Sequence, residues 1–556
     1  MSTAPPTTTR RLPLAGALRL GRPSDIWFKP ACSVVAAVAP PNLALLALGR
    51  LDLAMYTMAG SLCALYGHNR PYPARARTLA WVILGMVGGL AVALTAASLT
   101  TDAVVLVTVG ALMAAVQKVL CDATRVGPPG NVVLTFISSA SLFAPQTLGQ
   151  VPGHVGLALA AGAWAWLVGM APGLLRPHGP ERRATAQALN ATAAYADTRR
   201  TGTGTGDGPD RARAAAAGAV QAAWQSLLAT GARTDRTRRA LEHLVVRAEV
   251  ALAAPADADP ALLRGWARAL GGTGRVPRVA GADDDLLGID AELSAPRRPL
   301  WRRLGPLAPF AVRTALGCAL AGYASLALGV GRPYWALVTA ASLYQANVTL
   351  TWSRGVQRVV GNLLGVLVFA AVVPLAHLHP AALVLCCLAF NFGAEALIGR
   401  NYWLGSVCVT PMALLVTEFA RTQDAGQLIT ERVVDTLVGA LVGFATAVVV
   451  TNRRAGDRIG DALTAVEQAR EQAARLLAGP QPAPRALEAA RRALSAALAD
   501  LRAAADAASG EWWQRVLPQE RVVLAEQSGH RTLAATVRRQ GTHSWDGART
   551  TEDLRP

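Results

Sequence analysis

The stretch RPYWALVTAASLYQANVTLTWSRGVQRVVGNLLG, residues 332–365, contains the pattern that decides how this chain folds. Its apolar residues continue the apolar runs on both sides, yet it also carries two arginines, Arg354 and Arg358. Four residues make about one turn of an α-helix, so both arginines lie on one face of a predicted helix. Two cations on one face of an apolar helix need either a structural or a functional explanation.

The composition of the whole chain indicates a membrane protein. Of its 556 residues, 52% are hydrophobic and 16% are charged, whereas soluble domains carry about 25% charged residues. The mean hydropathy is +0.31, and the net charge is +18. A basic balance suits either nucleic acid or a membrane surface. Because the arginines flank apolar runs, the sequence predicts a lipid bilayer as the partner and no nucleic acid.

Apolar runs of roughly membrane-spanning length fall into two clusters, which predict two membrane halves at 30–175 and 305–452. The expected spans are 30–50, 52–66, 77–98, 102–121, 130–148 and 153–175 in the first half, and 307–330, 334–350, 355–376, 380–398, 402–419 and 431–451 in the second. The second run of each half is short or polar, which predicts a re-entrant or broken segment. The predicted fold class is therefore all-α, a polytopic membrane protein with two repeats of about six transmembrane helices plus helical cytoplasmic domains.

The distribution of arginine and lysine predicts the orientation in the membrane. With the N-terminus in the cytoplasm, most of these residues fall in cytoplasmic loops, and the exceptions are Arg332, Arg421 and Arg432. This orientation predicts a multi-pass protein of the plasma (inner) membrane with both termini in the cytoplasm. The predicted cytoplasmic parts are an N-terminal tail at 1–29, a helical insert with its linker at 176–304 and a helical C-terminal domain at 453–556.

The two halves also resemble each other in sequence. ARTLAWVILGMVGGL (76–90) aligns with SRGVQRVVGNLLGVL (353–367), which pairs Arg77 with Arg354 and Gly88 with Gly365. In this alignment Trp81 stands where Arg358 would be, so an anion site built on both arginines is expected in the second half alone. Gly361 and Gly365 have the small-xxx-small spacing that allows two helices to approach closely, as do Gly85 and Gly89 in the first half.

A candidate site for an organic anion lies in the opening stretch. Two guanidinium groups on one helix face attract an anion, and neighbouring aromatic and amide side chains supply stacking and hydrogen bonds. The alternatives are that Arg354 snorkels to cytoplasmic phosphates, that the aromatic pair belongs to an interfacial belt, and that the amides bind a neighbouring helix. The candidate residues are Arg354, Arg358, Trp335, Tyr334, Gln345 and Asn347.

Three carboxyl groups are candidates for carrying a proton. Glu431 and Asp435, in ERVVDTLVG, lie one turn apart on the last span, and Asp435 is expected inside the apolar zone. A carboxyl group at membrane depth is a functional hypothesis by default, and the alternative is an ion pair with Arg432 or Arg421. Glu395 is expected near the cytoplasmic end of its span, where pairing with Arg400 or Arg358 is the competing interpretation.

The sequence does not contain the motifs of common enzyme classes. It has no HExxH, no GxxxxGK[ST] phosphate loop and no CxxC pair. The seven cysteines lie in or beside apolar runs and are interpreted as packing residues. We therefore expect no enzyme activity, no cofactor and no metal site, whereas a homo-oligomer is compatible with the sequence.

The motifs of the second half resemble the fusaric acid resistance (FUSC) family, which is related to the bacterial aromatic acid exporters. The resemblance is carried by PYWALVTAASLYQ, by Arg354 and Arg358 leading into Gly361 and Gly365, by NYWLGSVCVTPMALL and by ERVVDTLVG. It covers roughly 306–452 well and 30–175 more loosely. The resemblance implies efflux of small organic, often aromatic, acids driven by the proton gradient.

Two alternative functions remain open at the level of sequence. The first is a passive organic-anion channel, which the plant malate channels of the same wider grouping suggest. The second is a membrane scaffold that transports nothing and binds a partner through its cytoplasmic helices. Proton-coupled efflux is the interpretation that uses both the arginines and the carboxyl groups of the second half.

Overall fold

The structure, a computed structural model, describes residues 14, 16–21, 26–201, 208–230, 235–272, 274–279, 304–420, 423–450, 455–480, 483–509 and 518–552. Every regular element in these ranges is a helix, which confirms the predicted all-α class. Arg421, one of the exceptions to the positive-inside pattern, lies outside the described residues.

The helices of the two membrane halves follow the predicted runs. The first half comprises α1 (Phe28–Ala47), α2 (Ala54–Ser61), α3 (Tyr72–Leu99), α4 (Ala103–Thr124), α5 (Val132–Leu142) and α6 (Val151–Leu175). The second comprises α13 (Ala308–Ala327), α14 (Tyr334–Leu343), α15 (Val348–Ala376), α16 (Pro380–Ile398), α17 (Tyr402–Thr417) and α18 (Ala425–Val449). By length and composition, eight helices of the described chain can cross a membrane, and the shorter apolar ones include α5, α14 and α17.

The break inside the opening stretch lies earlier than the sequence predicted. α14 ends at Leu343 rather than near 350, and α15 begins at Val348 rather than at 355. Asn347 caps α15, because its side-chain oxygen accepts a hydrogen bond from the Leu350 amide at 2.8 Å. Arg354 and Arg358 therefore do not begin a span. They lie about two and three turns inside a helix of 29 residues.

The two halves share one pattern of helix contacts. Within each half the second helix packs on the sixth, and the third packs on both the fifth and the sixth. The contacts between the halves also correspond. The first helix of each half contacts the fourth helix of the other half (α1 with α16, α13 with α4), and the second contacts the fifth (α2 with α17, α14 with α5). Equal contacts in equal order are what two parallel repeats produce.

The packing corrects the register of this repeat by one residue. A Cβ on Gly365 would lie 2.7 Å from Cβ of Thr410 on α17, and a Cβ on Gly89 would lie 2.9 Å from Oγ of Ser138 on α5. Gly88, which the sequence alignment paired with Gly365, has no atom within 4 Å of such a Cβ. The counterpart of Arg358 is therefore the buried Val82, and Trp81 faces outward with 73% of its surface exposed.

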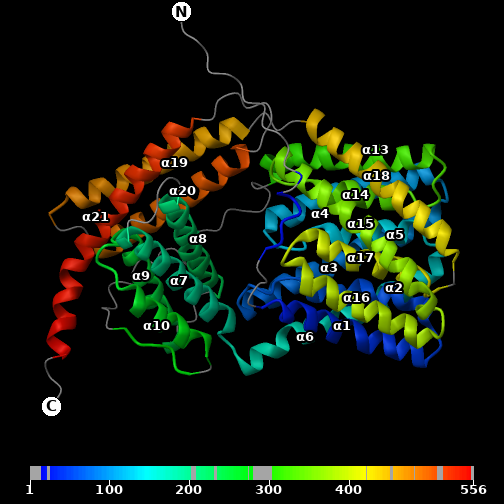
Figure 1. The fold of residues 1–556 in the computed structure, drawn as a ribbon, viewed down its shortest axis with the longest axis horizontal. Coiled ribbons are helices and arrows are strands. Elements are labelled where there is room, and N and C mark those ends of the chain that lie inside the picture. Colours follow the sequence, from blue (N-terminus) through cyan, green and yellow to red (C-terminus); the bar gives the residue numbers. More distant parts are fainter. Residues whose placement is uncertain are drawn as a thin grey trace, which may run out of the picture.

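The remaining helices form a separate helical region at one end of the membrane helices (Figure 1). The insert contributes α7 (Gly179–Thr201), α8 (Gly208–Leu228), α9 (Arg236–Ala253) and α10 (Pro260–Gly271). The C-terminal part contributes α19 (Ala455–Ala478), α20 (Pro484–Ser509) and α21 (Gln519–Glu552). We call the membrane-helix ends that adjoin this region, such as Leu175 and Val449, the domain side. The opposite ends, such as Ala376 and Ala425, form the far side.

The insert and the C-terminal part pack into one body, since α8 contacts α20 and α9 contacts α21. A buried ion pair joins them, with Arg491 on α20 lying 2.8 Å from the Glu249 carboxylate on α9. Arg491 also pairs with Glu488 at 2.6 Å, and Arg492 lies over the Trp224 ring of α8. Two segments that are far apart in the sequence thus form a single core.

A short N-terminal segment, residues 16–21, docks on the domain side of α15 and α17. Its backbone carbonyl groups accept hydrogen bonds from the side chains of Gln357, Asn401 and Trp403. The Gly21 amide completes the contact by donating to the Arg400 carbonyl at 2.8 Å. The N-terminal segment, the insert and the C-terminal part therefore all lie on the domain side.

Candidate functional site

Three of the helices that carry the candidate site, α15, α17 and α18, each begin at a side-chain cap. Asn347 starts α15, Asn401 starts α17 by accepting from the Trp403 amide, and Asp424 starts α18 by accepting from the Gln427 amide. Asn and Asp are favoured at this position because their oxygens satisfy backbone amides that have no partner inside the helix. The local sequence thus fixes where each helix begins, and with it the depth of the side chains that follow.

Arg354 and Arg358 share one aromatic partner, Tyr402 on α17. The guanidinium carbon of Arg354 lies 3.9 Å from the centre of the Tyr402 ring, and Nη1 of Arg358 donates to the Tyr402 hydroxyl at 3.0 Å. Arg358 is buried, with 4% of its surface exposed. The structure therefore brings the partly buried Arg354 and the buried Arg358 to one ring, and it adds Tyr402, which the sequence did not single out.

Helix α15 approaches α17 so closely that only glycine fits at the contact. A Cβ on Gly361 would lie 2.6 Å from the Trp403 carbonyl oxygen, so any larger residue would collide with the α17 backbone. Next to this contact, Asn362 donates to the Thr436 hydroxyl of α18 at 3.0 Å and accepts from Thr410 of α17 at 2.6 Å. This polar link, residues Asn362, Thr410 and Thr436, ties together the three helices of the site.

Tyr334 and Trp335 do not belong to an aromatic belt at the membrane surface, so that alternative is wrong. Both are buried at the start of α14, whose ten residues are all buried. The Tyr334 ring lies 5.7 Å from Phe143, and the Trp335 ring lies 5.5 Å from Phe136. Because both phenylalanines belong to the first half, this aromatic cluster lies where the two repeats meet.

Arg432 is the functional candidate that the sequence interpretation missed. Its guanidinium carbon lies 3.9 Å from the centre of the Trp335 ring, and its side chain is 1% exposed. Its Nε and Nη1 atoms have no hydrogen-bond partner. The charges of Arg358 and Asp435 both act on it. In the sequence ERVVD it stands next to an acid, so the sequence suggested only an ion pair with a nearby carboxylate.

Asp435 is fully buried on α18, as its position in the apolar zone predicted. Its Oδ1 accepts a hydrogen bond from the Ser325 hydroxyl of α13 at 2.5 Å, and its Oδ2 has no hydrogen-bond partner. It forms no ion pair with Arg432 within 4.0 Å. One oxygen of this buried carboxyl group therefore binds a neutral hydroxyl group, and the other oxygen has no hydrogen-bond partner.

The other two carboxyl candidates have different surroundings. Glu431 pairs with Arg332 at 2.5 Å and accepts from Gln427 at 2.9 Å. The charge of Arg332, one of the exceptions to the predicted positive-inside pattern, is thus paired with an acid. Glu395 lies near the domain-side end of α16, and in the described part of the chain it forms no ion pair with Arg358 or Arg400.

The two amide candidates have backbone partners in the turn between α14 and α15. The Gln345 side-chain amide donates to the Tyr344 carbonyl at 3.3 Å, whereas its main-chain carbonyl accepts from Nη2 of Arg313 at 3.0 Å and its main-chain N–H donates to the Thr351 hydroxyl at 3.2 Å. Asn347 caps α15 and its Nδ2 donates to the Asp506 carbonyl of α20 at 3.4 Å. Asn347 therefore joins the membrane part to the helical region, whereas the contacts of Gln345 stay within the membrane part. Tyr402 is the residue that contacts both arginines.

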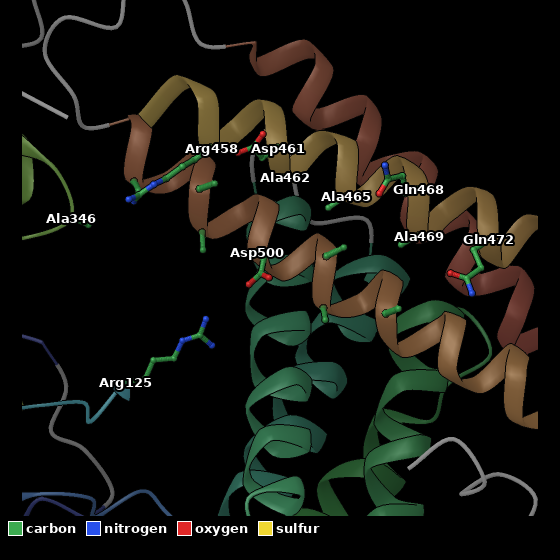
Figure 2. A pocket seen from close by; sticks show the side chains of 16 residues that line it. Arg125, Ala346, Arg458, Asp461, Ala462, Ala465, Gln468, Ala469, Gln472 and Asp500 are labelled. Atoms are coloured by element: carbon green, nitrogen blue, oxygen red, sulfur yellow. The ribbon is translucent and has the colours of Figure 1, made fainter. Parts of the chain in front are cut away.

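A cleft of about 860 Å³ lies between this turn and the C-terminal helices (Figure 2). Alanines of α19 and α20 form most of its lining, and Arg125, Arg458, Asp461 and Asp500 supply its charged groups. None of the predicted site residues lines it, although Ala346 of the same turn does. The described residues hold no group of three or more metal-ligating side chains.

Comparison with known proteins finds a family match in the second half and one similar membrane protein. Residues 319–446 match the family described as fusaric acid resistance protein-like. The uncharacterized membrane protein YvaC of Bacillus subtilis (strain 168) is 30% identical over 139 residues, which are 24% of this chain and 22% of that relative. No solved structure matches the chain significantly. The second membrane half therefore carries a fusaric acid resistance protein-like region, which confirms the resemblance that its motifs indicated.

Proposed function

We propose that the chain is a proton-coupled exporter of small organic acids in the plasma membrane. The observation that carries this proposal is the asymmetric charge of the interior. The second half buries arginines and a carboxyl group among α14, α15, α17 and α18, whereas Val82 occupies the place of Arg358 in the first half. The matched family, whose description refers to resistance against an organic acid, supports the same substrate class.

In this proposal Arg354 and Arg358 bind the carboxylate of the substrate. Both guanidinium groups face Tyr402, so they are held close together before any ligand arrives. Paired guanidinium groups in a poorly solvated site bind carboxylates strongly, because each can supply parallel N–H donors. The domain side is the cytoplasmic side, in agreement with the positive-inside pattern, so the substrate enters from the cytoplasm.

Asp435 is the proposed proton carrier. It is a buried carboxyl group whose Oδ2 has no partner, and ionisable groups at membrane depth commonly belong to ion or proton pathways. Glu431 is a weaker candidate because Arg332 already engages it. Glu395 lies on a different helix, α16, and its participation would require a second pathway.

Asp435→Asn in proteoliposomes tests the coupling. We expect a pH gradient to drive benzoate transport by the wild type and not by this variant, since the amide cannot exchange a proton. Asp424→Asn is the matched control on the same helix, because asparagine preserves the cap at that position. Equal pH-driven transport in wild type and Asp435→Asn would contradict the coupling. A benzoate current without proton movement would identify a passive channel, and absence of all transport would favour the scaffold.

A further inference from the structure

We infer that Arg432 is a second binding position for the carboxylate of the transported acid, on the far side of Arg358. This inference rests on the proposed function, because it concerns the same route through the second half. It adds a residue on α18, outside the Arg354–Arg358 pair on α15. The route then has two anion positions rather than one.

The first observation is that Arg432 is buried without acceptors for its N–H groups. Only 1% of its surface is exposed, and Nε and Nη1 have no hydrogen-bond partner. Arg75, a buried arginine of the first half, also has an unpartnered Nε, but its Nη1 and Nη2 donate to the Gly169 and Ala64 carbonyls. Buried charged groups in proteins are normally paired and hydrogen-bonded. The Trp335 ring supplies a face for the guanidinium but no acceptor.

The second observation concerns the charges around Arg432. The charged and titratable groups that act on it are Arg358, Asp435, Tyr334 and Tyr402. Asp435 is held by Ser325 and lies beyond ion-pair distance, and Glu431 is paired with Arg332. Two arginines thus face one carboxyl group in a region of low dielectric. A mobile anion supplies the acceptor and the negative charge that this region lacks.

The third observation is the order of these groups along the helices. α15 and α18 run antiparallel and meet where Asn362 bonds Thr436. Arg358 precedes Asn362 by one turn toward the domain side, and Arg432 precedes Thr436 by one turn toward the far side. The two arginines therefore flank the polar link, and a carboxylate that leaves Arg358 for the far side next meets Arg432.

Benzoate binding to the purified full-length protein in nanodiscs tests the inference. We expect Arg432→Gln to weaken benzoate affinity about 10- to 100-fold, the range for losing a charge-assisted hydrogen bond. Arg432→Lys, which keeps the charge, should recover part of this loss. Arg50→Gln is the matched control, because it removes an exposed far-side arginine and breaks only a surface ion pair with Asp52, and its affinity should equal that of the wild type.

Thermal unfolding separates ligand binding from a purely structural role. Removing an unpaired buried cation should leave Arg432→Gln at least as stable as the wild type without benzoate. Saturating benzoate should raise the Tm of the wild type and raise that of Arg432→Gln much less, because only bound ligand contributes stability. A variant that loses stability while it keeps wild-type affinity would assign Arg432 to structure alone and overturn the inference.

The outcomes also separate this inference from the proposed function. If the wild type transports benzoate, Arg358→Gln abolishes transport and Arg432→Gln behaves as the wild type, the function stands and the second position is wrong. If the wild type neither binds nor transports benzoate, the proposed substrate class fails and the second position fails with it. Loss of transport in both variants, with normal transport by Arg50→Gln, supports both.

Discussion

At the scale of single residues, the partner of each arginine decides what its charge can do. Arg332 is neutralised by Glu431, Arg358 donates to Tyr402, and Arg432 has only the face of Trp335. The charge of Arg332 is therefore balanced by an acid, the guanidinium group of Arg358 is oriented by a hydroxyl group, and that of Arg432 rests only on an aromatic face. Because an ion pair forms over a few ångströms, these differences follow from which helices meet and not from residue type.

Tyr402→Phe tests whether the Tyr402 hydroxyl orients Arg358 for the anion. The change keeps the ring beneath Arg354 and removes the acceptor of the hydrogen bond from Arg358. We expect benzoate affinity to fall about 3- to 10-fold, in line with the net value of one hydrogen bond. Tyr323→Phe removes an exposed hydroxyl that bonds Thr108 and should leave affinity unchanged. Unchanged affinity in Tyr402→Phe would show that Arg358 needs no such support.

At the scale of helices, close packing of α15 on α17 sets the geometry of the site. Gly361 and Gly365 bring the two backbones together, and the polar link then joins α18 to the pair. The predicted packing role of these glycines is confirmed by the crowding that a Cβ would meet there. This close contact also holds Tyr402, at the start of α17, against the second and third turns of α15.

Gly361→Ala should lower the Tm of the protein in detergent. The new Cβ would lie 2.5 Å from Cβ of Ser406 and 2.6 Å from the Trp403 carbonyl oxygen, so a helix must shift. Overpacking of this kind costs about 1–3 kcal/mol, which exceeds the gain of about 1 kcal/mol in helix propensity. Gly88→Ala is the control, since nothing lies within 4 Å of its Cβ, and its Tm should not fall. A similar Tm change in both variants would rule out the close contact.

At the scale of the whole molecule, two segments that flank the second membrane half assemble into one helical body. The insert and the C-terminal helices meet through α8 with α20 and α9 with α21. That body reaches the membrane part where Asp506 of α20 accepts a hydrogen bond from Asn347. The helical region therefore contacts the turn that begins α15, the helix of Arg354 and Arg358.

Arg491→Ala should loosen the insert as well as the C-terminal helices. Burial raises the pKa of the Glu249 carboxyl, and the Arg491 charge opposes this effect by favouring the ionised form. Removing one partner of a buried ion pair costs about 3–5 kcal/mol, so hydrogen exchange should quicken in both α9 and α20. Arg470→Ala breaks an exposed pair with Glu467 and should change exchange little. Faster exchange confined to α20 would show that the two segments fold independently.

The sequence by itself determined the helical class and the two sets of apolar runs, because hydrophobic patterning acts over a few residues. It also singled out Arg354, Arg358 and Asp435, of which the structure buries Arg358 and Asp435. The predicted start of α15 is too late because apolar residues continue through the Asn347 cap. The predicted register of the repeat is wrong by one residue because sequence similarity alone does not show which glycine contacts the neighbouring helix. Only the tertiary structure showed that Arg432 lies against Trp335 and that Tyr402 contacts both Arg354 and Arg358. It also showed that Tyr334 and Trp335 are buried against the first half and that Glu431 forms an ion pair with Arg332. Each of these outcomes depends on which helices pack together, and that is set by contacts between residues far apart in the chain.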